Sequence, residues 1–146
     1  MCTQGRDDVA CSTPASVFVI DGDPEVLRSL ELLLGTLHLA VEVFPSAEAA
    51  LPRIIERPPR CLVSEVFLPG MSGTDLQRLL LAKGIHVPAI MLATHADVPL
   101  AVEAMRLGAV DFIEKPIIDR VVLARVREAV LAPAPERIEE ERGSSV

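Results

Sequence analysis

The chain has 146 residues, half of them hydrophobic, and carries a net charge of −7 at pH 7 with an isoelectric point near 4.9. This length supports one well-buried core and is too short for two ordinary domains, and the acidic balance argues against a nucleic-acid surface, which requires a clustered basic face. The sequence contains no apolar run of membrane-spanning length and no secretory signal at its start, so we expect a cytoplasmic protein that binds neither membrane nor nucleic acid directly.

The chain divides into three parts. Residues 1–15 are polar and show no periodicity, which predicts a flexible N-terminal arm. Residues 16–131 alternate β-branched apolar runs with amphipathic segments, which predicts one folded domain. Residues 132–146 begin with alternating alanine and proline and continue into a glutamate-rich stretch, so we expect a linker or tail there.

Five strand and helix pairs follow one another in the folded part. The expected strands cover residues 17–21, 40–44, 61–65, 89–93 and 110–113, and the expected helices cover residues 24–37, 47–57, 74–83, 98–107 and 119–131. This alternation predicts an α/β fold, with a parallel sheet covered by helices on both faces. Ligands bind such a sheet at the carboxyl ends of its strands, where this chain places Asp21, Gly22, Asp23, Glu65, Ala93, Thr94 and Lys115.

Four segments carry a resemblance to a known family: SAEA at 46–49, LPGMSG at 68–73, HADVP at 95–99 and AVEAMRLGAVDFIEKP at 101–116. They resemble receiver domains of bacterial two-component response regulators, most of all the FixJ-type group, and the resemblance covers roughly residues 16–130. It implies a (βα)5 flavodoxin-like, CheY-like fold and a signalling protein in place of an enzyme.

Receivers of this family use five positions: two metal-binding acids, an acceptor aspartate, a Ser or Thr, and a lysine. The resemblance places Asp21, Gly22, Glu65, Ala93 and Lys115 at them, so three of the five depart from the pattern. Gly22 removes a metal ligand, Glu65 moves the nucleophile outward by a methylene, and Ala93 lacks a hydroxyl. The resemblance therefore implies a degenerate phosphorylation site, with Mg²⁺ binding weak or absent and only a residual site at Asp21 and the Phe67 carbonyl.

Other candidate residues have two interpretations each. Asp23 either replaces the lost metal ligand or caps the helix that begins at Pro24. Thr94 either substitutes for the missing hydroxyl or turns its side chain away, because it lies one residue further along the strand exit. Phe112 matches the aromatic switch position of the family, and Lys115-Pro116 resembles the family's cis peptide bond.

The leading functional hypothesis is a pseudo-receiver, which signals and dimerises in transcriptional control without standard aspartyl phosphorylation. In it, Glu65 and Lys115 form an ion pair that holds either the active-like or the inactive state. One alternative is a working phosphoacceptor that uses Glu65 or a nearby acid. Another is a phosphatase of the haloacid-dehalogenase type, in which Asp21, Asp23, Thr94 and Lys115 would supply the chemistry.

The resemblance also implies a homodimer, formed by the fourth helix, the fifth strand and the fifth helix. The expected dimer face contains Val98, Ala101, Val102, Met105, Asp111, Val122 and Arg125. The alternative is that Val98, Val102 and Met105 all point into the sheet as ordinary core. Further partners implied by the family are a sensor histidine kinase and an output domain outside this chain.

Overall fold

The computed structural model describes residues 16–95 and 97–132, and the expected N-terminal arm and almost all of the expected tail lie outside these residues. The strands are β2 (Ser16–Ile20), β3 (Ala40–Phe44), β4 (Cys61–Glu65), β5 (Ala89–Ala93) and β6 (Ala109–Glu114). The helices are α1 (Pro24–Gly35), α2 (Ala47–Glu56), α3 (Gly73–Ala82), α4 (Val98–Arg106) and α5 (Asp119–Leu131). Strands and helices alternate throughout the described part, as the sequence predicts.

The strands form one parallel sheet in the order β3-β2-β4-β5-β6. The chain steps outward from β2 to β3 on one side and from β4 to β6 on the other, so the order reverses between β2 and β4. In doubly wound sheets the ligand crevice lies at this reversal, outside the carboxyl ends of the strands. Asp21 follows β2 and Glu65 ends β4, so the fold places both acids at that point.

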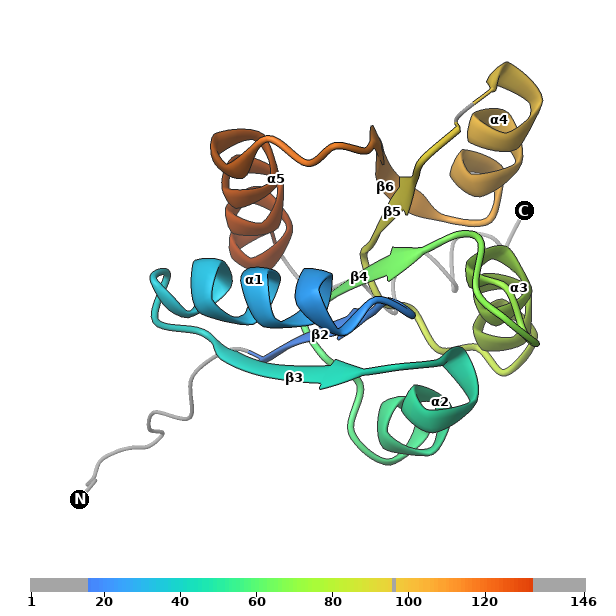
Figure 1. Ribbon diagram of the computed structural model, residues 1–146. Coiled ribbons are helices and arrows are strands. Elements are labelled where there is room, and N and C mark those ends of the chain that lie inside the picture. Colours follow the sequence, from blue (N-terminus) through green and yellow to red (C-terminus); the bar gives the residue numbers. More distant parts are fainter. Residues whose placement is uncertain (1–15, 96, 133–146) are drawn as a thin grey trace.

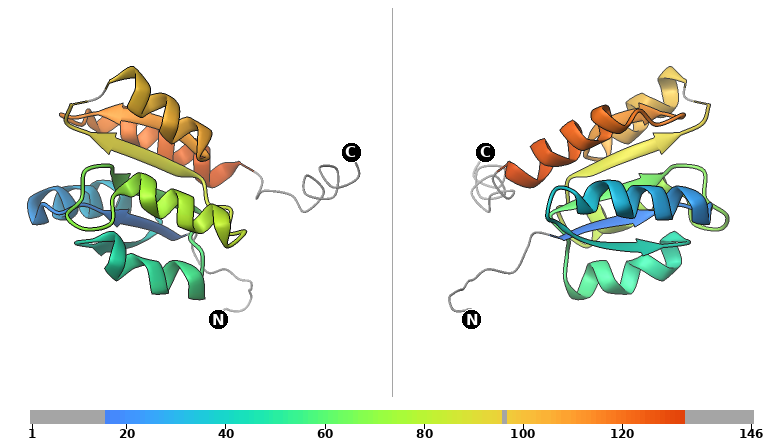
Figure 2. Two further views of the ribbon diagram at one scale, coloured as in Figure 1. Left: turned by 90° about the vertical axis from the view of Figure 1, so that its right-hand side faces the viewer. Right: turned by 60° about the vertical axis from the view of Figure 1, so that its left-hand side comes forward.

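Helices cover both faces of the sheet, with α1 and α5 on one face and α2, α3 and α4 on the other (Figures 1 and 2). Alternating strand residues supply the two cores: Val17 and Val19 pack with α1 and α5, while Phe18 and Ile20 pack on the opposite face. β4 and β5 are buried along their whole length, which explains the continuous apolar sequence of β5 and of the first three residues of β4.

Side-chain caps set several helix ends. Asp23 caps α1, Ser46 caps α2 and Asp97 caps α4, each by accepting a backbone N–H of the first turn. The expected helix over residues 24–37 is too long by two residues, because the backbone changes to i→i−3 hydrogen bonds at Leu37 and His38 and His38 takes a positive φ of 61°. Within the described ranges, we find no helix with the length and hydropathy needed to cross a bilayer.

Candidate functional site

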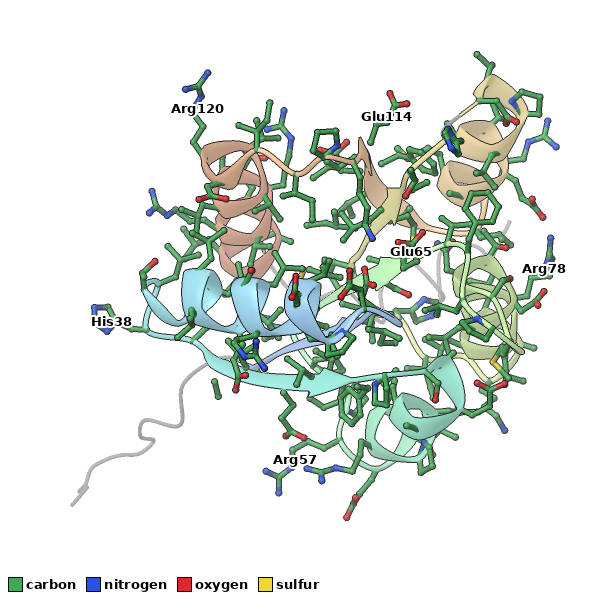
Figure 3. The ribbon with its side chains drawn as sticks, viewed as in Figure 1. His38, Arg57, Glu65, Arg78, Glu114 and Arg120 are labelled. Atoms are coloured by element: carbon green, nitrogen blue, oxygen red, sulfur yellow. The ribbon has the colours of Figure 1, made fainter. Side chains whose placement is uncertain are left out.

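Lys115 joins two buried acids at the carboxyl edge of the sheet. Its Nζ lies 2.8 Å from Oδ2 of Asp21 and also forms an ion pair with Oε1 of Glu65. Asp21 and Glu65 are 2% and 6% exposed, so both carboxylates depend on protein partners for their stability. The structure therefore brings together three sequence candidates that lie far apart in the chain, and Figure 3 shows Glu65 in the interior at the end of β4.

The second oxygen of each acid is engaged by the backbone. Oδ1 of Asp21 accepts the N–H of Asp23 at 2.9 Å, and Oε2 of Glu65 accepts the N–H of Phe67 at 3.3 Å. Both oxygens of both carboxylates thus have a partner. The cluster of two carboxylates and one ammonium group is closed on itself and carries one net negative charge.

The environment raises the pKa of Lys115 above its ordinary value of 10.5. Burial is the largest single influence and lowers the pKa, but the hydrogen bonds and charges of Asp21 and Glu65 together outweigh it. Lys115 is therefore charged throughout the physiological range and remains a fixed counter-charge. The Lys115–Pro116 peptide bond is cis, as the sequence predicts.

The residues present offer few ligands for a magnesium ion. Gly22 offers no carboxylate, and Asp23 is occupied as the cap of α1, with its side chain accepting the N–H of Glu25 at 2.9 Å. Asp21 faces Lys115, whose charge opposes that of a cation. The part of the chain that the structure describes holds no group of three or more His, Cys, Asp or Glu side chains arranged for a metal. Hard cations need several oxygen ligands with net negative charge. In this cluster the oxygens already have partners, and one of the two negative charges is compensated by Lys115.

The switch-equivalent residues lie at the end of β5 and on β6. Ala93 is fully buried, and its carbonyl accepts the N–H of Lys115 at 2.8 Å, so its backbone borders the cluster. Thr94 is exposed. Phe112 is half-buried and packs against the core that contains Ala93. A hydroxyl able to link the acids to Phe112 is therefore lacking at Ala93.

The loop from β4 to α3 is held by contacts that sequence reasoning missed. Oε2 of Glu48, from α2, accepts the N–H of Met71 at 2.8 Å. A Cβ at Gly73 would lie 2.5 Å from the Glu65 carbonyl oxygen and 2.6 Å from a Met91 methyl, so only glycine fits there. The SAEA and LPGMSG segments thus meet in space, with the first supporting the loop that follows Glu65.

Helix α4 and strand β6 expose apolar side chains. Val98, Val102 and Met105 are 75%, 45% and 47% exposed, so the alternative that all three point into the sheet is wrong. Val110 on β6 is 51% exposed and extends the same set of surface residues.

One residue of the expected dimer face needs correction. Val122 is fully buried in the core under α5, because the apolar stripe of that helix faces the sheet, and it cannot contact a partner. Asp111 and Arg125 do lie on the surface, where the Nε of Arg125 is 2.5 Å from Oδ2 of Asp111. We define the α4–β6 face as Val98, Ala101, Val102, Met105 and Val110, bordered by this ion pair.

Comparison with known proteins gives the family. The model described as the response regulator receiver domain matches residues 17–127. The transcriptional regulatory protein FixJ of Azorhizobium caulinodans is 43% identical over 130 residues, which make up 89% of this chain and 62% of that protein. Nodulation protein W of Bradyrhizobium diazoefficiens is 43% identical over 115 residues, or 79% of this chain and 51% of that protein. The chain thus spans between half and two thirds of these relatives.

Solved structures agree in fold. The crystal structure of FixJ-N matches with a TM-score of 0.76 and 37% identity, covering 86% of this chain and 100% of that one. A response regulator receiver protein from Pseudoalteromonas atlantica matches with a TM-score of 0.73 and 32% identity, covering 79% of this chain and 96% of that one. The fold is flavodoxin-like, as in CheY. The chain belongs to the response regulator receiver domain family of two-component systems.

Proposed function

We propose that this chain is a pseudo-receiver, which transmits a signal by protein contacts and does not depend on aspartyl phosphorylation. The observation that carries the proposal is the closed cluster of Asp21, Glu65 and Lys115, in which both oxygens of both acids have partners. Lys115 supplies within the chain a positive charge that contacts both acids and compensates one of their two negative charges. The cluster is therefore stable without a metal or a phosphoryl group.

Three differences argue against phosphoryl transfer to Glu65. Catalysis of this reaction consists mainly of positioning and charge neutralisation, so it is sensitive to each missing group. Gly22 weakens the metal site, Ala93 removes a donor to the phosphoryl oxygens, and Glu65 places its carboxylate one methylene further out. We accordingly propose that Mg²⁺ binds weakly or not at all.

We further propose that the unphosphorylated chain forms a homodimer through the α4–β6 face. Exposed apolar groups beside an ordered ion pair are typical of a contact surface, with the charges setting register more than affinity. Transcriptional regulator is the printed role of the FixJ relatives, so we propose a role in transcriptional control, in the bacterial cytoplasm. A sensor kinase and an output domain are the proposed partners.

The alternative functions receive no support from the geometry. A phosphatase of the haloacid-dehalogenase type would need Asp23 as acid and base, but this side chain caps α1. A Glu65 acceptor would need a free carboxylate oxygen, but both oxygens have partners. We therefore propose signalling and not catalysis as the role of the site.

Treatment with acetyl phosphate and Mg²⁺, followed by intact-mass spectrometry, tests the proposal. We expect no stable phosphorylated species from the natural chain and a clear one from the triple variant Gly22→Asp, Glu65→Asp, Ala93→Thr. The variant is sterically allowed at position 22, where an added Cβ would lie 3.8 Å from the ring of Pro69. Because the three groups act together, single reversions should restore little.

The matched control carries Asn in place of Asp at position 65 and keeps the other two changes. It should stay unlabelled, which would assign the phosphoryl group to residue 65. A stable phosphorylated species from the natural chain would overturn the pseudo-receiver proposal.

A further inference from the structure

The α4–β6 face contains an accessible methionine. Met105 is 47% exposed, and its side chain lines a surface hollow together with Ala101, Val102 and Arg106. Ala101 and Val102 precede it by four and three residues, so the three side chains are neighbours on one side of α4. The thioether therefore belongs to the apolar surface that we propose as the dimer contact, and it is open to solvent in a single chain.

The other sulfur atoms of the described residues are less accessible. Met91 and Cys61 are fully buried, and Met71 is half-buried against the core under α2, α3 and α4. Burial also raises the pKa of the Cys61 thiol, so the thiolate that reacts with peroxides is scarce at neutral pH. Because oxidation of sulfur follows its accessibility, Met105 is the most reactive of these four side chains.

We infer that Met105 is a redox-sensitive modification site, at which oxidation of the thioether by hydrogen peroxide shifts the chain from dimer to monomer. In this step a sulfur lone pair attacks one peroxide oxygen, the O–O bond breaks, an S–O bond forms and water leaves. Sulfur is oxidised and the peroxide is reduced. The inference rests on the homodimer proposed above and adds a means of regulating it.

The direction of the shift follows from the polarity of the sulfoxide. Its oxygen accepts hydrogen bonds from water on the surface of a monomer, and an apolar contact would remove that water. Arg106 can donate to the oxygen within the chain, but burying this pair in a contact would also remove water from the guanidinium. A symmetric dimer contains each contact residue twice, so the cost arises at both copies of Met105.

Peroxide treatment, peptide mapping and multi-angle light scattering test the inference on the full chain. In dilute, monomeric protein we expect Met105 to oxidise about threefold faster than Met71, and the oxidised chain to dimerise about tenfold more weakly. Cys2 and Cys11 lie outside the described residues, so their oxidation needs a separate control. Dithiothreitol alone reverses disulfides and should leave the chain monomeric, whereas dithiothreitol with methionine sulfoxide reductases A and B should restore the dimer.

Two variants complete the experiment. Met105→Leu keeps an apolar side chain of similar volume and should dimerise within about threefold of the natural chain, before and after peroxide. Met105→Gln introduces a polar acceptor and should dimerise about tenfold more weakly without any peroxide. Thermal unfolding confirms that both variants are folded.

The inference is overturned if the dimer persists after full oxidation of Met105, or if peroxide dissociates Met105→Leu as it does the natural chain. Slower oxidation of Met105 than of Met71 also contradicts it. These outcomes leave the homodimer in place. An untreated natural chain that is monomeric at every concentration removes the homodimer proposal and this inference together.

Discussion

Lys115 forms ion pairs with two buried carboxylates at the same time. It contacts one oxygen of each of two buried carboxylates, while backbone N–H groups satisfy the other two. Removing the ammonium group would leave two buried negative charges close together without compensation, which is the costly case for buried ion pairs. The lysine side chain is 17% exposed, so solvent screens this cost only in part.

We expect Lys115→Met to lower the free energy of unfolding by about 2–4 kcal/mol at pH 7. Urea unfolding followed by circular dichroism measures this loss. Lys83→Met, at an exposed lysine after α3, is the control and should change stability by less than about 0.5 kcal/mol. Equal losses in the two variants would show that the cluster does not contribute to stability.

Cys61 gives the chain a predicted sensitivity to alkaline pH. Burial in β4 raises the pKa of its thiol from 9.0 to about 12, with a smaller opposing effect from its hydrogen bond to Leu62. Above pH 9 the unfolded chain loses this proton and the folded chain keeps it. Stability is therefore complete below pH 9 and falls by about 1.4 kcal/mol for each pH unit above it, until the folded-state pKa is reached.

The variant Cys61→Val keeps an apolar side chain in the buried strand. It should remove the part of the stability loss above pH 9 that comes from the thiol. Urea unfolding between pH 8 and pH 10.5 measures the loss of stability that Cys61 causes. The contribution of Lys115 to stability is lost only above pH 10.5, because its pKa is raised from that value in the folded chain. Lys115, like Cys61, lowers the stability as the pH rises, because the folded state holds a proton that the unfolded state releases. Identical pH profiles for natural chain and variant would contradict the burial of the thiol.

At the scale of elements, the end of α5 is fastened to the start of β4. Nη2 of Arg60 donates to the carbonyls of Val130 and Ala132 at 2.6 and 2.8 Å, two acceptors at the helix end. The N–H of Arg60 also donates to the Ser16 carbonyl at 2.8 Å. A cation at this end is favoured by the helix dipole as well as by the hydrogen bonds. Arg60 thus holds the last turn of α5 against the start of β4.

Arg60→Ala should cost about 1–2 kcal/mol of stability and speed amide hydrogen exchange in the last turn of α5. The nearby Arg57→Ala is the control, because Arg57 is exposed and its side chain points away from the molecule (Figure 3). Exchange rates at Val130 and Leu131 that match in the two variants would count against the capping role.

The strands and helices could be predicted because their signals are local. Apolar periodicity located all ten elements, and cap residues such as Asp23 and Ser46 set their starts. The end of α1 could not be predicted, because Leu33 and Leu37 continue the helical pattern, whereas the chain turns at His38, a non-glycine residue with a φ of 61°. The expectation that Val122 lies on the surface of α5 was wrong for a similar reason, since the sequence does not say which stripe of the helix faces the sheet.

Some residues of the candidate site could likewise be predicted from the sequence, and others could not. Asp21, Glu65 and Lys115 follow from strand order, because the ends of parallel strands meet at one edge. Glu48 supports the loop after Glu65 through a backbone hydrogen bond, and the sequence contains no sign of that partner.

At the scale of the whole molecule, the acid cluster and the α4–β6 face have separate places. The acid cluster lies at the carboxyl edge of the sheet, while the α4–β6 face lies on the side of the sheet that ends with β6. Helix α1, on the other face of the sheet, exposes Leu32 at 71%. Leu32 is thus an exposed apolar residue away from the proposed dimer contact.

The α4–β6 face and Leu32 allow a matched test of the dimer. We expect the natural chain, without phosphorylation, to dimerise at micromolar concentration, and Val102→Asp to weaken the dimer tenfold or more, because a charge would be buried in the contact. Leu32→Asp introduces the same charge at an exposed apolar site outside the α4–β6 face and should leave the dimer unchanged. Multi-angle light scattering over a concentration series gives the mass, and thermal unfolding confirms that both variants are folded. A natural chain that remains monomeric at every concentration would remove the interface, whereas equal weakening by both substitutions would mean that the contact does not lie on α4.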